Sequence, residues 1–347
     1  MEILLIGAFE DQQTGIYIAR SMFELEHTVE AIDSRKFFQE LGSIESQKAI
    51  IAEIDDYATQ YYPKMIMILK GLELHPATIQ YLKEKFPDAK LVNWFFDVYL
   101  GEEPIWKAKE YLSVIKMFDY YICSLKGVAD KLREDGFDNV YYVDEACYPQ
   151  SNGEVHMNWY QTVKYGNDVS FVGALGYLKQ HSNRTKILKK VSKECFNLSI
   201  WGPIVEDWTK IGVELKPHHR GKSVINETHS MVAQSSLINL GIDQNRDIDM
   251  GHSARLYRVM CAGGLYLLNA TKGVDKMFKV NKDGAEITGD EELVFYYSED
   301  DLINKIDFLL EHDDIRKKIA KNGQKAVLEK HKFTGRINEI IELIGEK

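Results

Sequence analysis

The chain has 347 residues, of which 45% are hydrophobic, and its formal net charge is −10. This apolar content is enough for ordinary globular cores, which excludes a disordered or fibrous protein, and the length predicts two domains. The acidic balance argues against a nucleic-acid partner. No apolar run approaches the roughly 20 residues that a membrane span needs, so we expect none.

The N-terminal sequence MEILLIGAF has no basic region and continues directly into an apolar strand pattern. It is therefore not expected to be a signal peptide. The four cysteines, Cys123, Cys147, Cys195 and Cys261, are scattered and lack the spacing of metal ligands. We expect buried free thiols and a cytoplasmic protein with no metal and no bound cofactor.

Strand and helix patterns alternate along the first half of the chain. Apolar runs predict strands at 2–6, 29–33, 65–69, 91–96, 120–124 and 140–143, and helical spacing predicts helices at 16–25, 43–61, 77–85 and 128–135. This alternation is typical of a parallel sheet covered by helices. We therefore predict an α/β domain of the Rossmann-like kind.

Polar residues follow several of these strands. Gly7 ends the first strand and Gly15 opens the next helix, but the spacing is not a dinucleotide-binding fingerprint. Lys70 and Asp97 follow the strands at 65–69 and 91–96, where parallel sheets place ligand sites. Asp97 is a candidate general base; the alternative is a helix N-cap or a loop carboxylate.

The second half repeats the alternation. We predict strands at 169–172, 198–201, 236–240, 265–268 and 292–297, and helices at 185–191, 231–235, 254–262, 300–310, 314–328 and 333–344. The polar and aromatic stretch 150–167 is only weakly periodic, so we place the hinge between the two domains there.

The stretch 251–269, GHSARLYRVMCAGGLYLLN, combines a polar lead-in, a short helix and a buried strand. Ser253 is predicted to cap the helix, and Gly263 and Gly264 are predicted to end it. Arg255 and Arg258 lie three residues apart in its first turn, near the free N–H groups and the positive end of the helix dipole.

Two guanidinium groups beside a helix start predict a clamp for a diphosphate. The alternative is that Arg255 and Arg258 pair with Asp247 and Asp249, and the sequence leaves both interpretations open. No compact group of acidic residues at a strand end is suited to holding Mg²⁺ or Mn²⁺ against a diphosphate, so we expect metal-independent chemistry.

Phrases spread along the chain resemble one family. They are EILLIG, NWFFDVY, FDYYICS, DVSFVGALG with Arg184 after it, LSIWG, TKGVDKMF, YYSEDDLINKIDFLL and IAKNGQKAVLEKHKFTGRI. Together with the stretch 251–269, their order resembles the GT-B-fold glycosyltransferases, in particular the spore-maturation CgeB-like branch with its group 1 type C-terminal domain. Many GT-B enzymes have two glutamates eight residues apart where this chain has Arg258 and Tyr266, so the stereochemical outcome stays open.

The resemblance implies two Rossmann-like domains facing a central cleft. Residues 1–160 would form the acceptor-side domain, 161–330 the nucleotide-sugar-binding domain, and 331–347 a helix crossing back to the first. The donor side would comprise Gly173, Arg184, Trp201, Gly202, Asn239, His252, Ser253, Arg255, Arg258, Gly263 and Gly264. The acceptor or cleft side would comprise Gly7, Gly15 and Lys70, with Asp97 as the base.

The function implied by the resemblance is glycosyl transfer from a nucleotide-diphospho-sugar, such as a UDP-sugar, to an unidentified acceptor. The nucleotide sugar would be a co-substrate rather than a bound cofactor. Two other functions stay open, because GT-B folds also serve nucleotide-sugar epimerases and because the chain could bind a nucleotide sugar without catalysis.

Overall fold

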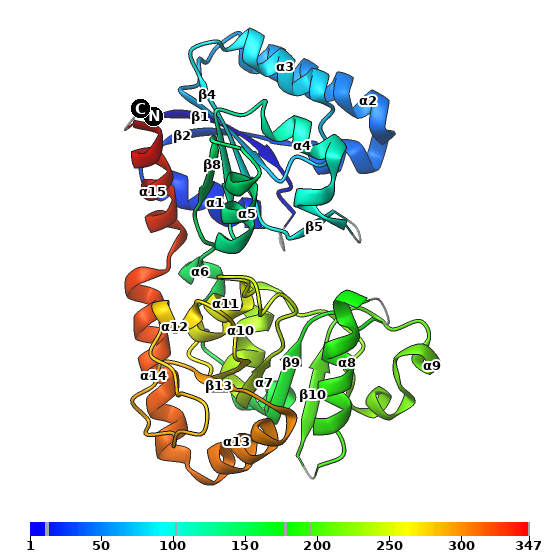
Figure 1. The fold of residues 1–347 in the computed structure, drawn as a ribbon, viewed down its shortest axis with the longest axis vertical. Helices are drawn as coiled ribbons and strands as arrows, with labels where there is room; N and C mark the ends of the chain where they lie inside the picture. The colour runs from blue at the N-terminus through cyan, green and yellow to red at the C-terminus, as the bar shows by residue number, and fades with distance from the viewer. Residues whose placement is uncertain (11–13, 101–102, 177–178, 195, 346–347) are drawn as a thin grey trace. The chain divides into compact units, whose positions relative to one another are not determined.

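The structure is a computed structural model that describes residues 1–10, 14–100, 103–176, 179–194 and 196–345. The chain divides into two compact units, which we call unit 1 (residues 1–145 and 333–347) and unit 2 (residues 146–332). Each unit is built around its own parallel β-sheet (Figure 1).

Unit 1 has a six-stranded parallel sheet in the order β2-β1-β3-β4-β7-β8 within the described residues. Side chains 3–6 of β1 are fully buried, which explains why this strand reads as a continuous apolar run. The strands are β1 (Glu2–Gly7), β2 (Thr28–Asp33), β3 (Met65–Leu69), β4 (Lys90–Phe95), β7 (Tyr120–Cys123) and β8 (Val140–Tyr142).

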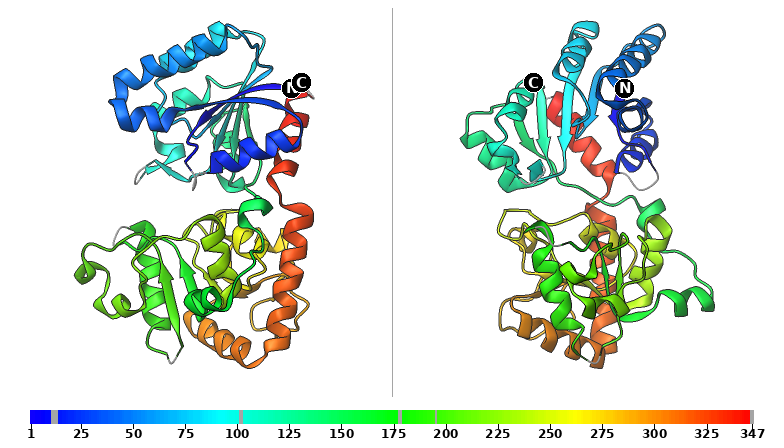
Figure 2. Two further views of the ribbon diagram at one scale, coloured as in Figure 1. Left: turned by 180° about the vertical axis from the view of Figure 1, so that it is seen from behind. Right: turned by 90° about the vertical axis from the view of Figure 1, so that its right-hand side faces the viewer.

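Helices α1 and α15 of unit 1 pack against each other, and so do α2 and α3 (Figure 2). The rings of Tyr17 and Phe333 stack at the α1–α15 contact, with 6.3 Å between their centroids. The helices are α1 (Thr14–Glu24), α2 (Ser34–Tyr57, kinked at Gly42), α3 (Pro76–Lys85), η1 (Ile105–Lys107), α4 (Lys109–Ile115), α5 (Lys126–Glu134) and α15 (Phe333–Gly345), with a small ribbon of β5 (Tyr99–Leu100) and β6 (Glu103–Pro104).

Over the described part of unit 2, the parallel sheet has five strands in the order β10-β9-β11-β12-β13. Its strand side chains alternate between two cores, since Leu267 packs in one apolar cluster while Tyr266 and Leu268 pack in the other. The strands are β9 (Asn167–Val172), β10 (Leu198–Trp201), β11 (Ser236–Gly241), β12 (Tyr266–Asn269) and β13 (Val294–Tyr296).

Helices cover both faces of this sheet. Side chains of α8 and α13 complete one core, and side chains of α11 and α14 complete the other. The helices of unit 2 are α6 (Pro149–Asn152), α7 (Trp159–Tyr165), α8 (Lys179–Val191), α9 (Trp208–Ile211), η2 (Val213–His218), α10 (Asn226–Ser235), α11 (Arg255–Cys261), α12 (Val274–Met277), α13 (Glu299–Glu311) and α14 (Asp313–Lys330).

The predicted fold class is confirmed, because both units are α/β with parallel sheets. The units divide at residues 145/146 and 332/333, however, rather than at the expected 160/161 and 330/331. The reason is that the segment after residue 145 packs within unit 2. Cys147 forms a β-bridge with Lys332, and Tyr165 of α7 packs beside Trp201 of β10.

The described helices include none that is both long enough and apolar enough to cross a membrane.

Candidate functional site

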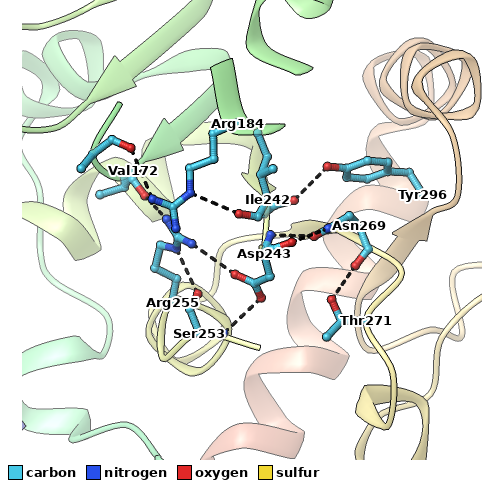
Figure 3. Close-up of polar contacts among 11 residues, drawn as sticks. Val172, Arg184, Ile242, Asp243, Ser253, Arg255, Asn269, Thr271 and Tyr296 are labelled. Carbon is cyan, nitrogen blue, oxygen red and sulfur yellow. Dashed lines mark hydrogen bonds and ion pairs between the residues drawn. The ribbon is translucent and has the colours of Figure 1, made fainter. Parts of the chain in front are cut away.

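Arg255, the first residue of α11, joins groups at the carboxyl ends of β9 and β11 (Figure 3). Its Nη1 donates to the Val172 carbonyl at 2.8 Å, and its Nε donates to Ser253 Oγ at 3.1 Å. Its Nη2 lies 3.2 Å from the carboxylate of Asp243, a side chain that is only 3% exposed. Because either charge would be left uncompensated without the other, this buried pair holds the guanidinium in place.

Glycine at position 173 leaves the space that Arg255 occupies. A Cβ atom at Gly173 would lie 2.5 Å from Arg255 Nη1, and one at Gly202 would lie 2.4 Å from the Gly173 carbonyl oxygen. The guanidinium also lies over the ring of Phe171, 5.5 Å from its centroid, where a cation–π attraction adds to its stability. Gly173 therefore leaves room for the arginine itself, and Gly202 leaves room for the backbone of Gly173.

Asp243 is a residue of this site that the sequence analysis missed. Its Oδ2 accepts from the Ser253 backbone N–H at 3.1 Å. Its own backbone is fixed by Asn269, whose amide makes two bonds of 2.7 Å with the N–H and the carbonyl of Asp243. Thr271 Oγ1 in turn donates to the Asn269 carbonyl at 2.8 Å. The only sequence signal was its position just beyond a predicted strand.

The alternative pairing of Arg255 with Asp247 or Asp249 is wrong, because the ion-pair partner of Arg255 is Asp243. Asp247 lies 3.8 Å from Arg246, and Asp249 lies 3.4 Å from Lys276.

Ser253 is not the N-cap of α11, which corrects the prediction. The helix begins at Arg255 and Ala254 occupies the cap position. No side chain among the described residues caps the helix. The Ser253 hydroxyl instead accepts from Arg255 Nε. The end of the helix is as predicted, since Gly263 adopts a left-handed φ of +80° directly after the last turn. Gly264 allows close packing, because a Cβ atom there would lie 2.6 Å from the Ala233 carbonyl oxygen.

Arg184 reaches the same region from α8 (Figure 3). The sequence predicts Arg184 at the start of a helix over 185–191. In the structure it lies inside α8, which begins at Lys179. Its Nη1 lies 3.3 Å from the Ala174 carbonyl oxygen, and its Nε lies 3.4 Å from the Ile242 carbonyl oxygen. Burial and the nearby positive charge of Arg255 lower the pKa of Arg184 to about 10. An anion bound beside both guanidinium groups would relieve this repulsion.

Arg258 lies half-buried on α11, and its charge acts on His229, a buried residue of α10. Burial, then the charges of Arg258 and Arg255, lower the pKa of His229 to about 3, so its imidazole is neutral at neutral pH. Neither ring nitrogen of His229 has a hydrogen-bond partner within the described residues. Sequence reasoning missed this residue because the predicted helix began at 231.

Three predicted donor-side residues have buried side chains that contact the protein core. Trp201 packs against Tyr165 with 5.6 Å between ring centroids. Asn239 accepts from Ser170 Oγ and donates to the Ala233 carbonyl, both at 2.9 Å. His252 Nε2 lies 3.1 Å from the Tyr257 hydroxyl. The donor role predicted for all three stays a prediction.

In unit 1 the structure brings Lys70 and Asp97 together. Lys70 Nζ lies 2.6 Å from Asp97 Oδ2, and the two side chains are 40% and 45% exposed. They follow the adjacent strands β3 and β4, as predicted. Asp97 is not an N-cap: it lies between β4 and β5, and the following helices η1 and α4 have Pro104 and Ala108 at their cap positions.

Gly7 and Gly15 are accounted for by packing inside unit 1. A Cβ atom at Gly7 would lie 2.9 Å from Leu69 Cβ, and one at Gly15 would lie 2.3 Å from the Ala8 carbonyl oxygen.

Over the part of the chain that the structure describes, no group of three or more His, Cys, Asp or Glu side chains is arranged to hold a metal ion.

Comparison with known proteins adds one sequence match and several structural ones. Residues 183–342 match the family model described as glycosyl transferase-like. No curated protein matches the chain in sequence.

Three solved structures illustrate the structural similarity. Sucrose-phosphate synthase from Thermosynechococcus elongatus is 10% identical with a TM-score of 0.68, and 99% of this chain and 98% of that chain are covered. The catalytic domain of starch synthase IV from Arabidopsis thaliana, bound to ADP and acarbose, is 10% identical with a TM-score of 0.66 and coverage of 97% and 99%. HepE from Anabaena, in complex with UDP and glucose, is 10% identical with a TM-score of 0.64 and coverage of 99% of both chains.

At this level of identity the similarity establishes the fold. The chain therefore has the two-domain GT-B fold of these glycosyltransferase structures, and residues 183–342 within it match a glycosyl transferase-like family.

Proposed function

We propose that this chain transfers a sugar from a nucleotide-diphospho-sugar to an acceptor hydroxyl group. The observation that carries the proposal is the convergence of Arg184 and Arg255 on the carboxyl ends of β9 and β11, where Asp243 and backbone carbonyls hold them. This edge of a parallel sheet is where α/β proteins bind ligands.

Glycosyl transfer requires stabilisation of the diphosphate that leaves the sugar. Guanidinium groups that are already in place stabilise this developing charge without reorganisation during the reaction. Arg255 has five N–H donors, of which Val172, Ser253 and Asp243 engage three in the bonds described above. Among the described residues, this orientation therefore leaves two N–H donors of Arg255 for a phosphate oxygen.

We assign the positive charge at the diphosphate to Arg255, Arg184 and Arg258 in place of a divalent metal ion. Arg258 is included because its charge and that of Arg255 both lower the pKa of His229, which indicates that the two arginines act on the same region. The resemblance in sequence supports membership of the CgeB-like branch. UDP is the first nucleotide to test, because HepE is similar in fold and was solved with UDP.

On the acceptor side we assign Asp97 as the general base. Its carboxylate lies at the carboxyl edge of the unit 1 sheet and remains partly exposed to solvent. It would accept the proton of the acceptor hydroxyl as the oxygen attacks the sugar, which is the chemistry of an inverting transfer.

A turnover assay tests this function against the two alternatives. The protein is incubated with UDP-glucose or ADP-glucose in EDTA, with simple sugars as acceptors, and nucleotide and glycosylated product are quantified. We expect nucleotide release with product formation at a rate that EDTA leaves nearly unchanged. An epimerised sugar nucleotide without transfer would indicate an epimerase, and binding without turnover would indicate a binding protein. A loss of activity that Mn²⁺ or Mg²⁺ restores would contradict the assignment to arginines.

A further inference from the structure

Lys70 has an unusual backbone conformation. Its φ is +60°, a left-handed value that glycine adopts easily and a lysine rarely does. The Gly71 N–H donates to the Leu69 carbonyl at 2.7 Å and closes a three-residue turn around Lys70. A turn of this length with a positive φ at its centre is strained. The strain occurs at the carboxyl end of β3, on the edge of the sheet where ligand sites lie.

The surroundings fix this conformation through three hydrogen bonds. The Lys70 N–H donates to the Trp94 carbonyl at 2.9 Å, and the Lys70 carbonyl accepts from Asn93 Nδ2 at 3.1 Å and from the Tyr111 hydroxyl at 3.4 Å. The Tyr121 hydroxyl then donates to that of Tyr111 at 3.2 Å. A strained residue persists only where its neighbours determine its conformation in this way, and such residues concentrate at functional sites.

Holding the Lys70 turn also leaves a buried polar atom of Asn93 without a hydrogen bond among the described residues. Asn93 is fully buried, and its Oδ1 has no hydrogen-bond partner within the described residues because the amide is turned to serve the Lys70 carbonyl. A glycine at position 70 would remove the backbone strain. The lysine therefore contributes something that a glycine could not, and its ammonium group contacts Asp97 at 2.6 Å.

We propose that Lys70 is a positioning residue whose strained turn holds its ammonium group against Asp97 and thereby orients that carboxylate toward the acceptor. This role rests on the proposed glycosyl transfer. In the step, the acceptor O–H gives its proton to Asp97, the oxygen bonds to the anomeric carbon, and the bond from that carbon to the diphosphate oxygen breaks with its electron pair. Lys70 keeps its protons throughout.

The variant Lys70→Gly separates this role from a structural one. Glycine accepts the positive φ, so the melting temperature should be maintained or rise, although the ion pair is lost. Nucleotide release from UDP-glucose or ADP-glucose should nevertheless fall about 10- to 100-fold, because a misoriented catalytic group costs rate. The loss should appear in kcat, while KM for the nucleotide sugar stays unchanged.

Two further variants sharpen the test. Lys70→Met keeps the strain but removes the ammonium, so it should lose the same rate without gaining stability. Lys70→Arg should recover part of the rate. Glu26→Gly is the matched control, since Glu26 has a φ of +59° in the same unit at an exposed position after α1. It should gain stability and leave the rate unchanged.

A purely structural role for Lys70 would instead give a lower melting temperature and a wild-type rate per folded molecule in Lys70→Gly, and this result would overturn the inference. Wild-type turnover by Lys70→Met would overturn it as well. Calorimetry with UDP and ADP on the same proteins distinguishes a wrong role for Lys70 from a wrong proposed function. Absence of nucleotide binding by the wild type contradicts the donor site, whereas normal binding with undiminished turnover in the variants contradicts only the role of Lys70.

Discussion

Replacing Arg255 with alanine is expected to weaken the binding of UDP or ADP by about 10- to 150-fold. This factor corresponds to about 1.5–3 kcal/mol, the usual contribution of hydrogen bonds to a charged group. Arg255→Lys should restore only part of the affinity, because an ammonium group cannot reach Val172, Ser253 and Asp243 at once as the planar guanidinium does. Titration calorimetry on each variant measures the effect.

The alanine variant is also expected to lose about 3–5 kcal/mol of stability, since it leaves the Asp243 carboxylate buried without its partner. The double variant Arg255→Gln/Asp243→Asn removes both charges, so no buried carboxylate is left unpaired. Nucleotide affinity can then be measured on a folded protein. Arg316→Ala is the control: Arg316 is a buried arginine of α14 that donates to the Leu309 carbonyl at 2.7 Å and pairs with Asp313. Its loss should lower stability and leave nucleotide affinity intact. Wild-type affinity in a folded Arg255 variant would exclude the phosphate contact.

Replacing Asp97 with asparagine is expected to slow transfer by roughly 10²- to 10⁴-fold, the usual contribution of a positioned general base. Asparagine keeps the shape of the side chain and cannot take the proton. Nucleotide affinity should hardly change, because the proposed donor contacts lie in unit 2. Stability should change by about 1 kcal/mol or less, since a half-exposed ion pair contributes little.

Asp55→Asn is a matched control for this substitution. Asp55 of α2 forms an ion pair with Lys85 of α3 at the same distance of 2.6 Å, with side chains 46% and 34% exposed. This pair joins two helices and does not follow the strands β3 and β4. Any general effect of losing a half-exposed pair should appear in both variants. A slow Asp97→Asn protein beside a fully active Asp55→Asn protein supports the base, and equal activity in the two would remove Asp97 from the mechanism.

The fold could be predicted from the sequence because buried parallel strands read as short apolar runs. Residues 3–6 are an example, since all four side chains are fully buried. The position of Arg255 at the start of a helix was also predictable from spacing. The partner of Arg255 was not, because Asp243 lies twelve residues upstream in an irregular loop and meets it only through the tertiary structure.

Local rules failed where tertiary contacts compete with them. Ser253 has the composition of an N-cap, but its hydroxyl and N–H are engaged by Arg255 and Asp243. The strain at Lys70 could not be foreseen either, because backbone preferences argue against a lysine with a positive φ. Both departures occur at the two candidate sites, where local preference commonly yields to function.

Calorimetry of the wild-type protein tests the central claim most directly, with UDP and ADP compared with uridine and adenosine. The preferred nucleoside diphosphate should bind at least about 100-fold more tightly than its nucleoside, since the contacts proposed for Arg184 and Arg255 are to the phosphates. The advantage should shrink as salt is raised, because exposed parts of the charge attraction are screened. Equal affinity for a nucleoside and its diphosphate, or no binding of either diphosphate, would contradict the assignment of Arg184 and Arg255 to the leaving group.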